Sequence, residues 1–232
     1  MEPEFITYQK FNDAALAKQL AELLAEHSIS YFIEEGDMVF NPAFSYTDKK
    51  EYAVKVKPGD FERINDLLKQ DANETMGEVE PDYYLLAFTN EELMDVVTKA
   101  DEWNVFDVQL ARKLLAERGH AISDKEAAEI EEERIEELKK PEPSQNGWVI
   151  IGYIIAIGCL AMPFFISVIG LFIGWHLASH KKTLPNGEQI YAYNETDRKH
   201  GKRIFYIGIA VFLITLGILI YGAFFPKQYY EN

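Results

Sequence analysis

The sequence contains a single cysteine, Cys159, and its two long apolar runs, 147–178 and 204–225, contain no Lys, Arg, Asp or Glu. One cysteine excludes a disulfide framework and a cysteine-based metal site. Apolar runs without ionisable residues disfavour ion-coupled transport, which relies on such groups inside the membrane. The sequence also lacks a phosphate-binding glycine loop, a nucleophile elbow and an HExxH motif. We therefore expect no enzyme activity, no catalytic or metal site and no cofactor.

Positive charge is scarce in the first 146 residues, which carry 34 acidic side chains against 16 Lys and Arg, a net charge of −18. The remaining residues carry 4 acidic and 7 basic side chains, a net charge of +3, and the two parts add to the formal total of −15. Because nucleic-acid binding needs a basic face, the acidic part argues against a nucleic-acid partner.

The apolar runs predict an integral membrane protein whose partner is the lipid bilayer. Run 204–225 would be about 33 Å long as a helix, which matches a hydrocarbon layer of about 30 Å. Run 147–178 would be about 48 Å long, too long for an ordinary span, and Pro163 lies at its midpoint. We expect it to form a hairpin or re-entrant segment of two arms, and the alternative is one long span in a two-span protein.

Small residues at four-residue spacing occur in both arms of run 147–178. Gly152 and Ala156 lie in the first arm, and Gly170 and Gly174 lie in the second. Since small residues let membrane helices approach closely, we expect these four positions to pack the arms together.

Tryptophans and basic residues predict the membrane interface. The residues assigned to it are Trp148, Trp175, Lys181, Lys182, Arg198, Lys199, Lys202 and Arg203. In a hairpin, the two tryptophans reach the same interface. Basic residues concentrate on the cytoplasmic side, so connector 179–203 is expected in the cytoplasm. The N-terminal residues lack the pattern of a secretory signal, so we also expect 1–146 in the cytoplasm, attached to the inner (cytoplasmic) cell membrane.

The first 88 residues alternate between strand and helix patterns. Strands are expected at 5–11, 28–34, 51–57 and 83–88, with one helix between the first two and another between the last two. This order is the split βαβ pattern of ferredoxin-like domains. The fold class expected is therefore α+β: a ferredoxin-like domain at 1–88, a helical extension and linker at 89–146, and an all-α transmembrane module.

Two segments carry a resemblance to a known family. They are FITYQKFNDAALAKQLAELLAEHSISYFIEE and, after a loop, EYAVKVKPGDFERINDLL. Residues 6–70 resemble the small prokaryotic domains described as putative signal-transducing proteins, which have a PII-like or ferredoxin-like fold. The resemblance implies binding or signalling rather than a reaction.

Local motifs predict how the later helices begin and where the connector turns. Thr89–Glu92 and Ser123–Glu126 have the spacing of capping boxes. The second would open a helix rich in acidic residues, which we interpret as a solvated connecting helix. Pro185-Asn186-Gly187 predicts a turn in a small β-hairpin.

These features predict a membrane-anchored binding or regulatory protein. Its cytoplasmic domain would recognise a small ligand or a protein partner, and 147–178 with the span at 204–225 would hold it to the membrane. The alternative is a small accessory subunit of a membrane transport or channel complex, whose glycine-rich arms contact the pore-forming chain.

Overall fold

The computed structural model describes residues 4–37, 50–77, 79–158 and 165–224. The chain folds into two compact units, which are described separately. The head unit comprises Met1–Leu138 with Thr183–Glu188, and the helical unit comprises Lys139–Lys182 with Gln189–Asn232. Cys159 and Pro163 lie outside the described residues.

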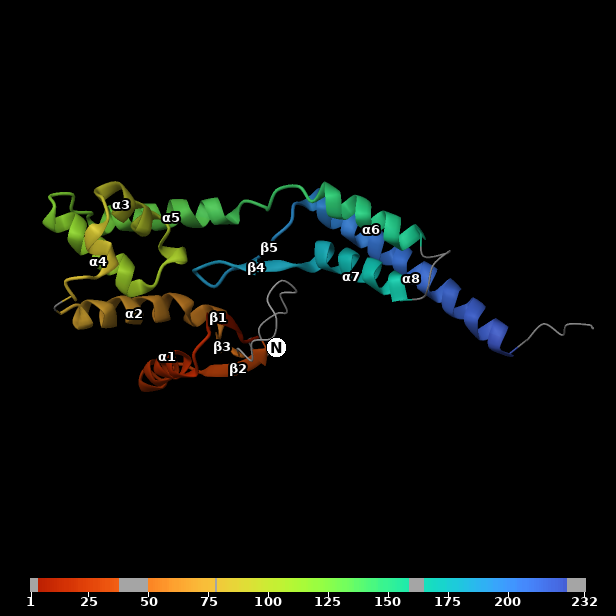
Figure 1. The fold of residues 1–232 in the computed structure, drawn as a ribbon, viewed down its shortest axis with the longest axis horizontal. Coiled ribbons are helices and arrows are strands. Elements are labelled where there is room, and N and C mark those ends of the chain that lie inside the picture. Colours follow the sequence, from red (N-terminus) through yellow and green to blue (C-terminus); the bar gives the residue numbers. More distant parts are fainter. Residues whose placement is uncertain (1–3, 38–49, 78, 159–164, 225–232) are drawn as a thin grey trace, which may run out of the picture. The chain divides into compact units, whose positions relative to one another are not determined.

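A three-stranded antiparallel sheet begins the head unit (Figure 1). Its strands are β1 (Ile6–Phe11), β2 (Tyr31–Asp37) and β3 (Lys50–Val56), in the order β1-β3-β2. Helix α1 (Ala14–Glu26) begins at the N-cap Asp13, whose side chain accepts from the backbone of Ala15. A 3₁₀ turn, η1 (Pro58–Asp60), leads into α2 (Phe61–Thr75). The apolar faces of these elements form one core, whose fully buried side chains include Leu24, Val54, Val56 and Ile64.

The fourth strand expected at 83–88 is wrong. Tyr84–Ala87 form a 3₁₀ turn, η2, and in the described residues β1 pairs only with β3. Leu85 is fully buried in the core of the helical extension, and the hydroxyls of Tyr83 and Tyr84 donate to Asp107. Because these contacts draw the segment to the helices, the head unit is α+β with the first three strands of the expected pattern.

Three further helices complete the head unit: α3 (Asn90–Thr98), α4 (Val105–Glu117) and α5 (Asp124–Lys139), with a 3₁₀ turn, η3 (Ala100–Glu102), before α4. Both predicted capping boxes are confirmed. The Thr89 hydroxyl accepts from the backbone of Glu92, and the Glu92 carboxylate accepts from Thr89. Ser123 and Glu126 repeat this arrangement at the start of α5.

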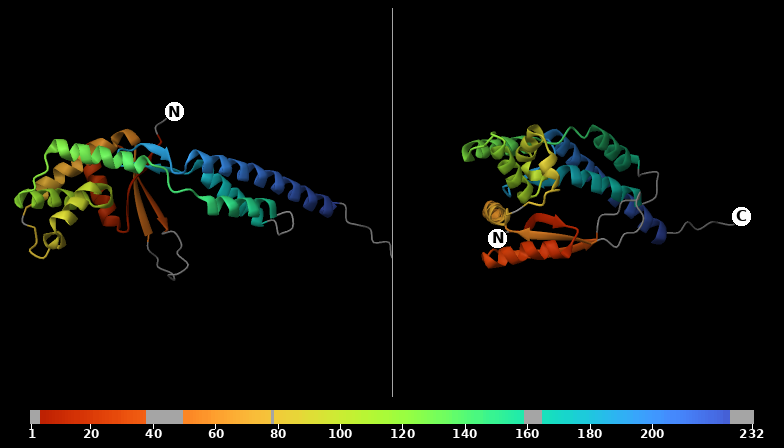
Figure 2. Two further views of the ribbon diagram at one scale, coloured as in Figure 1. Left: turned by 90° about the horizontal axis from the view of Figure 1, so that it is seen from above. Right: turned by 60° about the vertical axis from the view of Figure 1, so that its left-hand side comes forward.

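The described residues of the helical unit form helices α6 (Asn146–Gly158), α7 (Phe165–Ser179) and α8 (Glu195–Phe224). Strands β4 (Lys181–Thr183) and β5 (Gln189–Tyr191) form the predicted hairpin in the connector. Figure 2 shows α6 and α7 beside the first part of α8, which continues past them. Residues Glu195–Tyr221 are long and apolar enough to cross a membrane, the one such helix among the described residues.

The hairpin turn of the connector belongs to the head unit. Its Gly187 has φ +84°, a backbone conformation that favours glycine. A Cβ atom there would lie 2.5 Å from the carbonyl oxygen of Pro58 and 2.9 Å from Cγ of Phe61. The neighbouring Pro185 carbonyl accepts a 3.1 Å hydrogen bond from Asn65. Asn65 also accepts a 2.7 Å hydrogen bond from the hydroxyl of Tyr8. The turn therefore packs directly on the start of α2.

Replacing Gly187 with alanine is expected to loosen this turn from α2. Both the positive φ and the contact with Pro58 oppose a Cβ atom, so the loss of stability should be about 1–3 kcal/mol. The change would be measured by hydrogen exchange at the backbone amides of residues 184 and 187, which donate hydrogen bonds within the turn. Gly59→Ala is the matched control, because nothing lies within 4 Å of its Cβ position. Equal exchange in the two variants would contradict the packing described.

Candidate functional site

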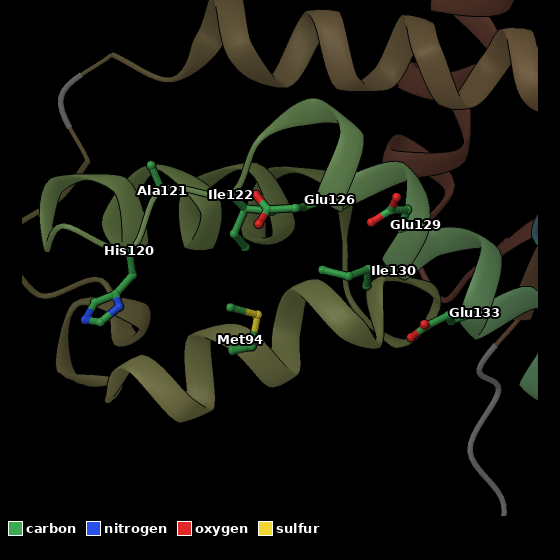
Figure 3. A pocket seen from close by; sticks show the side chains of 8 residues that line it. All are labelled: Met94, His120, Ala121, Ile122, Glu126, Glu129, Ile130 and Glu133. Carbon is green, nitrogen blue, oxygen red and sulfur yellow. The ribbon is translucent and has the colours of Figure 1, made fainter.

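An open groove of about 380 Å³ lies on the head unit between α3, α5 and the loop that joins α4 to α5 (Figure 3). Its apolar residues are Met94 from α3, Ala121 and Ile122 from the loop and Ile130 from α5. Its polar residues are His120, Glu126, Glu129 and Glu133. The groove thus offers apolar side chains bordered mainly by carboxylates.

Arg134 fixes the position of α5, the helix that forms one side of the groove. Its guanidinium makes a two-pronged contact with Asp101, with Nε to Oδ1 at 2.7 Å and Nη2 to Oδ2 at 3.0 Å. It also donates to Glu102 and Glu137. The hydrogen bond with Asp101 is the main cause that raises the pKa of Arg134 further above its usual value. Because the side chains of Arg134 and Asp101 are 14% and 18% exposed, this pair is shielded more than an ordinary surface ion pair.

The three groove glutamates have different surroundings. The Glu126 carboxylate accepts hydrogen bonds from the backbone and hydroxyl of Ser123, which lower its pKa. Glu129 forms an ion pair with Lys125 at 3.2 Å. Glu133 has no hydrogen-bond or ion-pair partner among the residues that the structure describes. The groove therefore retains net negative charge and at least one carboxylate ready to accept from a bound cation.

The chemistry of the groove residues indicates which partners they can contact. In the described ranges, no three His, Cys, Asp or Glu side chains come close enough together to hold a metal ion. Apolar side chains beside carboxylates are complementary to a partner whose surface is apolar and carries Lys or Arg side chains. The sequence interpretation of α5 as a solvated helix agrees with its exposed glutamates, but it did not identify this face as one side of a groove. The signal was the spacing of Glu126, Glu129, Ile130 and Glu133, which places all four side chains on one side of a helix.

The helical unit brings the predicted small residues to two different contacts. A Cβ atom at Gly170 would lie 3.3 Å from the backbone nitrogen of Ala156, so these two residues pack α7 against α6. Gly152 meets side chains of Ile173 on α7 and Ile204 on α8. Gly174 instead lies against α8, where a Cβ atom would be 2.5 Å from the Phe205 nitrogen.

The partner glycines on α8 were not among the sequence-predicted residues. A Cβ atom at Gly201 would lie 2.7 Å from the backbone nitrogen of Ala178, and one at Gly208 would lie 2.9 Å from Leu171. These two glycines are seven residues apart, which places them on the same side of α8. This seven-residue spacing is the feature of the sequence that could have identified Gly201 and Gly208 as contact positions.

The predicted interface residues gather at one end of the helical unit. Gly152 meets Ile173 and Ala156 meets Gly170, so α6 and α7 run antiparallel and Trp148 and Trp175 lie at the same end. Both tryptophans are exposed. Gly174 lies against Gly201, so Lys202 and Arg203 come at the level of Trp175.

The other predicted basic residues have defined neighbours in the connector. Lys181 and Arg198 both lie over the ring of Tyr191. Lys182 donates to the carbonyl of Lys140, and Lys199 pairs with Glu195 at 2.7 Å.

Comparison with known proteins gives no match to a family model, a curated protein or a solved structure.

Proposed function

We propose that this protein is an integral membrane binding protein of regulatory type, anchored by α8, whose head unit recognises a partner in the cytoplasm. The observation that carries the proposal is the groove at Met94, Ile122 and Ile130 with its border of glutamates, in a chain that also contains a membrane-length apolar helix. The resemblance of residues 6–70 to signal-transducing domains agrees with a binding role.

The level of the tryptophans supports a specific membrane arrangement. If the interface lies at Trp148, Trp175 and Lys202, the 21 residues from Ile204 to Phe224 extend about 31 Å, enough to cross the hydrocarbon layer. Helix α6 extends only about 15 Å from Trp148 to its end at Gly158. Helices α6 and α7 then form a re-entrant hairpin in the near leaflet, and α8 alone crosses the bilayer.

The charge distribution supports a cytoplasmic head. Connector 179–203 carries six Lys and Arg against three acidic residues, and basic residues next to membrane helices concentrate on the cytoplasmic side. The inner cell membrane is thus the proposed location. Recovery of the full chain in the supernatant of a detergent-free lysate would contradict the anchor. Reaction of the head with a membrane-impermeant label in intact cells would contradict the orientation.

The groove suits an amphipathic partner with a basic face. Its apolar floor would take Leu- or Ile-type side chains, and Glu133 would accept a Lys or Arg beside them. The probe that tests this is a short helical peptide of Leu and Lys, compared with the same peptide carrying Glu in place of Lys. We expect the full chain in zwitterionic nanodiscs to bind the basic peptide more tightly.

Glu133→Lys is expected to weaken binding of the basic peptide about fivefold, because an attractive contact becomes a repulsive one. Fluorescence anisotropy of labelled peptide would measure it. Glu132→Lys is the matched control: it makes the same charge change one residue away, at an exposed position that does not line the groove. Equal weakening by the two variants would show that overall charge, and not the groove, attracts the peptide.

A second candidate function is an accessory subunit of a membrane complex. The observation that favours it is the far part of α8, where Leu213, Ile218, Leu219 and Tyr221 are all more than half exposed. Polar substitution of this surface would release a membrane partner without changing peptide binding at the groove. Substitutions in the groove would have the opposite effect, so the two functions are separable in the full chain.

A further inference from the structure

Arg198 is a cation without an acceptor in the part of the chain that the structure describes. It lies in the first turns of α8, and the centre of its guanidinium is 3.3 Å from the ring centroid of Tyr191. The Nε atom is buried and has no hydrogen-bond partner among the described residues. A guanidinium has five N–H donors in a planar fork, and leaving a buried one, here that of Nε, unsatisfied is costly.

The acidic residues nearest to Arg198 in sequence are already engaged. Asp197 is buried, and its carboxylate accepts from the Asn194 amide, the Gln145 backbone and the Ser144 hydroxyl. Glu195 pairs with Lys199, and the hydrogen bond with Lys199 is the main cause that lowers the pKa of Glu195; the nearby charge of Arg198 adds to it. Neither carboxylate forms a hydrogen bond with the Arg198 guanidinium among the described residues.

Further positive charge surrounds the same place. The Lys181 ammonium lies 5.5 Å from the centroid of the Tyr191 ring, so two cations share one aromatic ring. Lys202 follows Arg198 by four residues on the same side of α8 and is exposed. Like charges in such proximity repel one another, and an anion bound among them would relieve the repulsion.

We propose that Arg198, Lys181 and Tyr191 form a binding site for the phosphate of an anionic phospholipid headgroup, with Lys202 beside it. The planar fork of Arg198 matches two phosphate oxygens, and stacking on Tyr191 fixes its orientation. Lys181 adds a point charge. The site lies at the end of the helical unit that bears Trp148 and Trp175, where a headgroup would meet it. Exposed apolar side chains of α7 and α8, such as Phe172 and Tyr206, are available to its acyl chains.

The lipid is the occupant favoured over free phosphate because the site adjoins apolar helices that expose large side chains to their surroundings. The site rests on the membrane anchoring proposed above, but it makes its own prediction. A chain that pellets with membranes yet shows no preference for anionic lipid would preserve the anchor and overturn the site.

The test titrates the full chain in neutral detergent with phosphatidylglycerol or phosphatidylcholine and counts retained lipids by native mass spectrometry. We expect one phosphatidylglycerol to be retained with at least roughly tenfold preference, since one charge-assisted bidentate contact has about that effect. Arg198→Gln should remove the preference, and Arg198→Lys should retain only part of it because the fork is lost. Inorganic phosphate at the concentration of the lipid should not compete, and full competition would overturn the lipid assignment.

Lys199→Gln is the matched control, because it removes the same charge from the next residue. Both it and the compared Arg198→Gln are made together with Glu195→Gln, so that loss of the Lys199–Glu195 pair does not release a carboxylate near Arg198. It should leave lipid retention unchanged. Equal loss in the Gln variants at 198 and 199 would mean diffuse attraction and would overturn the site. Tyr191→Phe, which keeps the ring, should retain the lipid, whereas Tyr191→Leu should weaken retention. A melting temperature of each variant without lipid separates these effects from misfolding.

Discussion

Gly201→Leu is expected to force α7 and α8 apart and to destabilise the helical unit by about 3 kcal/mol or more. A Cβ atom at residue 201 would lie 2.7 Å from the backbone nitrogen of Ala178, 2.7 Å from Cβ of Leu177 and 2.9 Å from the carbonyl oxygen of Gly174. Two of these atoms belong to the backbone of α7 and cannot move without the helix. Overpacking a well-fitted contact costs about 1–3 kcal/mol, and separating two helices adds lost contact along their length.

Thermal unfolding of the detergent-solubilised chain would measure the effect, and the glycines provide a graded series. Gly174→Leu should be as damaging as Gly201→Leu, because its Cβ position is 2.5 Å from the Phe205 nitrogen. Gly170→Leu should cost less, since its closest contact is 3.3 Å. Gly217→Leu is the control on α8, with nothing within 4 Å. A melting temperature lowered equally at residues 201 and 217 would contradict the close approach of α7 and α8.

The glycine contacts show what the sequence could and could not predict in the helical unit. The glycines selected by four-residue spacing lie at contacts between helices, because a missing Cβ atom lets a neighbouring helix approach. It could not say which helix each glycine faces. Gly170 meets α6, whereas Gly174, one turn later, meets α8. With three helices in contact, the choice depends on how each pair crosses, and spacing within one helix does not contain that information.

The head unit shows a similar limit at residues 83–88. Local signals were reliable where the structure they specify is local: both capping boxes form within four residues of sequence. The expected strand depended instead on pairing with β1, more than 70 residues away. Instead, the Tyr83 hydroxyl donates to Asp107, and Leu85 is buried in the core formed with α3 and α4. Aromatic and aliphatic residues occur in strands and in buried turns alike. Whether residues 83–88 pair with β1 or pack on α3 and α4 therefore depends on contacts with residues distant in sequence.

The groove was not predicted, for a related reason. Glu126, Glu129 and Glu133 read as a solvated helix face because acidic side chains at helical spacing are ordinarily exposed. Their relation to Met94 depends on the Arg134–Asp101 pair, which joins residues 33 positions apart and fixes where α5 lies. The same sequence with α5 detached would present no groove.

Asp107→Ala is expected to destabilise the head unit by about 3 kcal/mol. Asp107 is 2% exposed and accepts from the hydroxyls of Tyr83 at 2.5 Å and Tyr84 at 2.6 Å, and from the side-chain amide of Asn104. Its own backbone amide donates to Asn104 at the start of α4.

Hydrogen bonds to a charged acceptor contribute about 1.5–3 kcal/mol each, and removing the acceptor leaves its donors unpaired. Chemical unfolding would measure the loss, followed by the fluorescence of Trp103 in a chain whose Trp148 and Trp175 are replaced by Phe, since Trp103 packs beside Tyr84. Asp95→Ala, at an exposed ion pair on α3, should cost less than about 1 kcal/mol.

The same cluster predicts how the stability of the head unit depends on alkaline pH. Burial, reinforced by the hydrogen bond to Asp107 and the charge of its carboxylate, raises the pKa of Tyr83 from 10.0 to about 12. Because the folded state holds this proton more tightly than the unfolded state, the stabilisation is complete below pH 10 and is lost as pH rises through 12. The difference in tyrosinate absorbance between the native chain and Tyr83→Phe, measured against pH, should show Tyr83 ionising late. In Asp107→Asn the pKa of Tyr83 should fall towards 10, so stability should change less between pH 10 and 12. An unchanged Tyr83 titration in that variant would contradict the contribution of the Asp107 carboxylate and leave burial as the cause of the raised pKa.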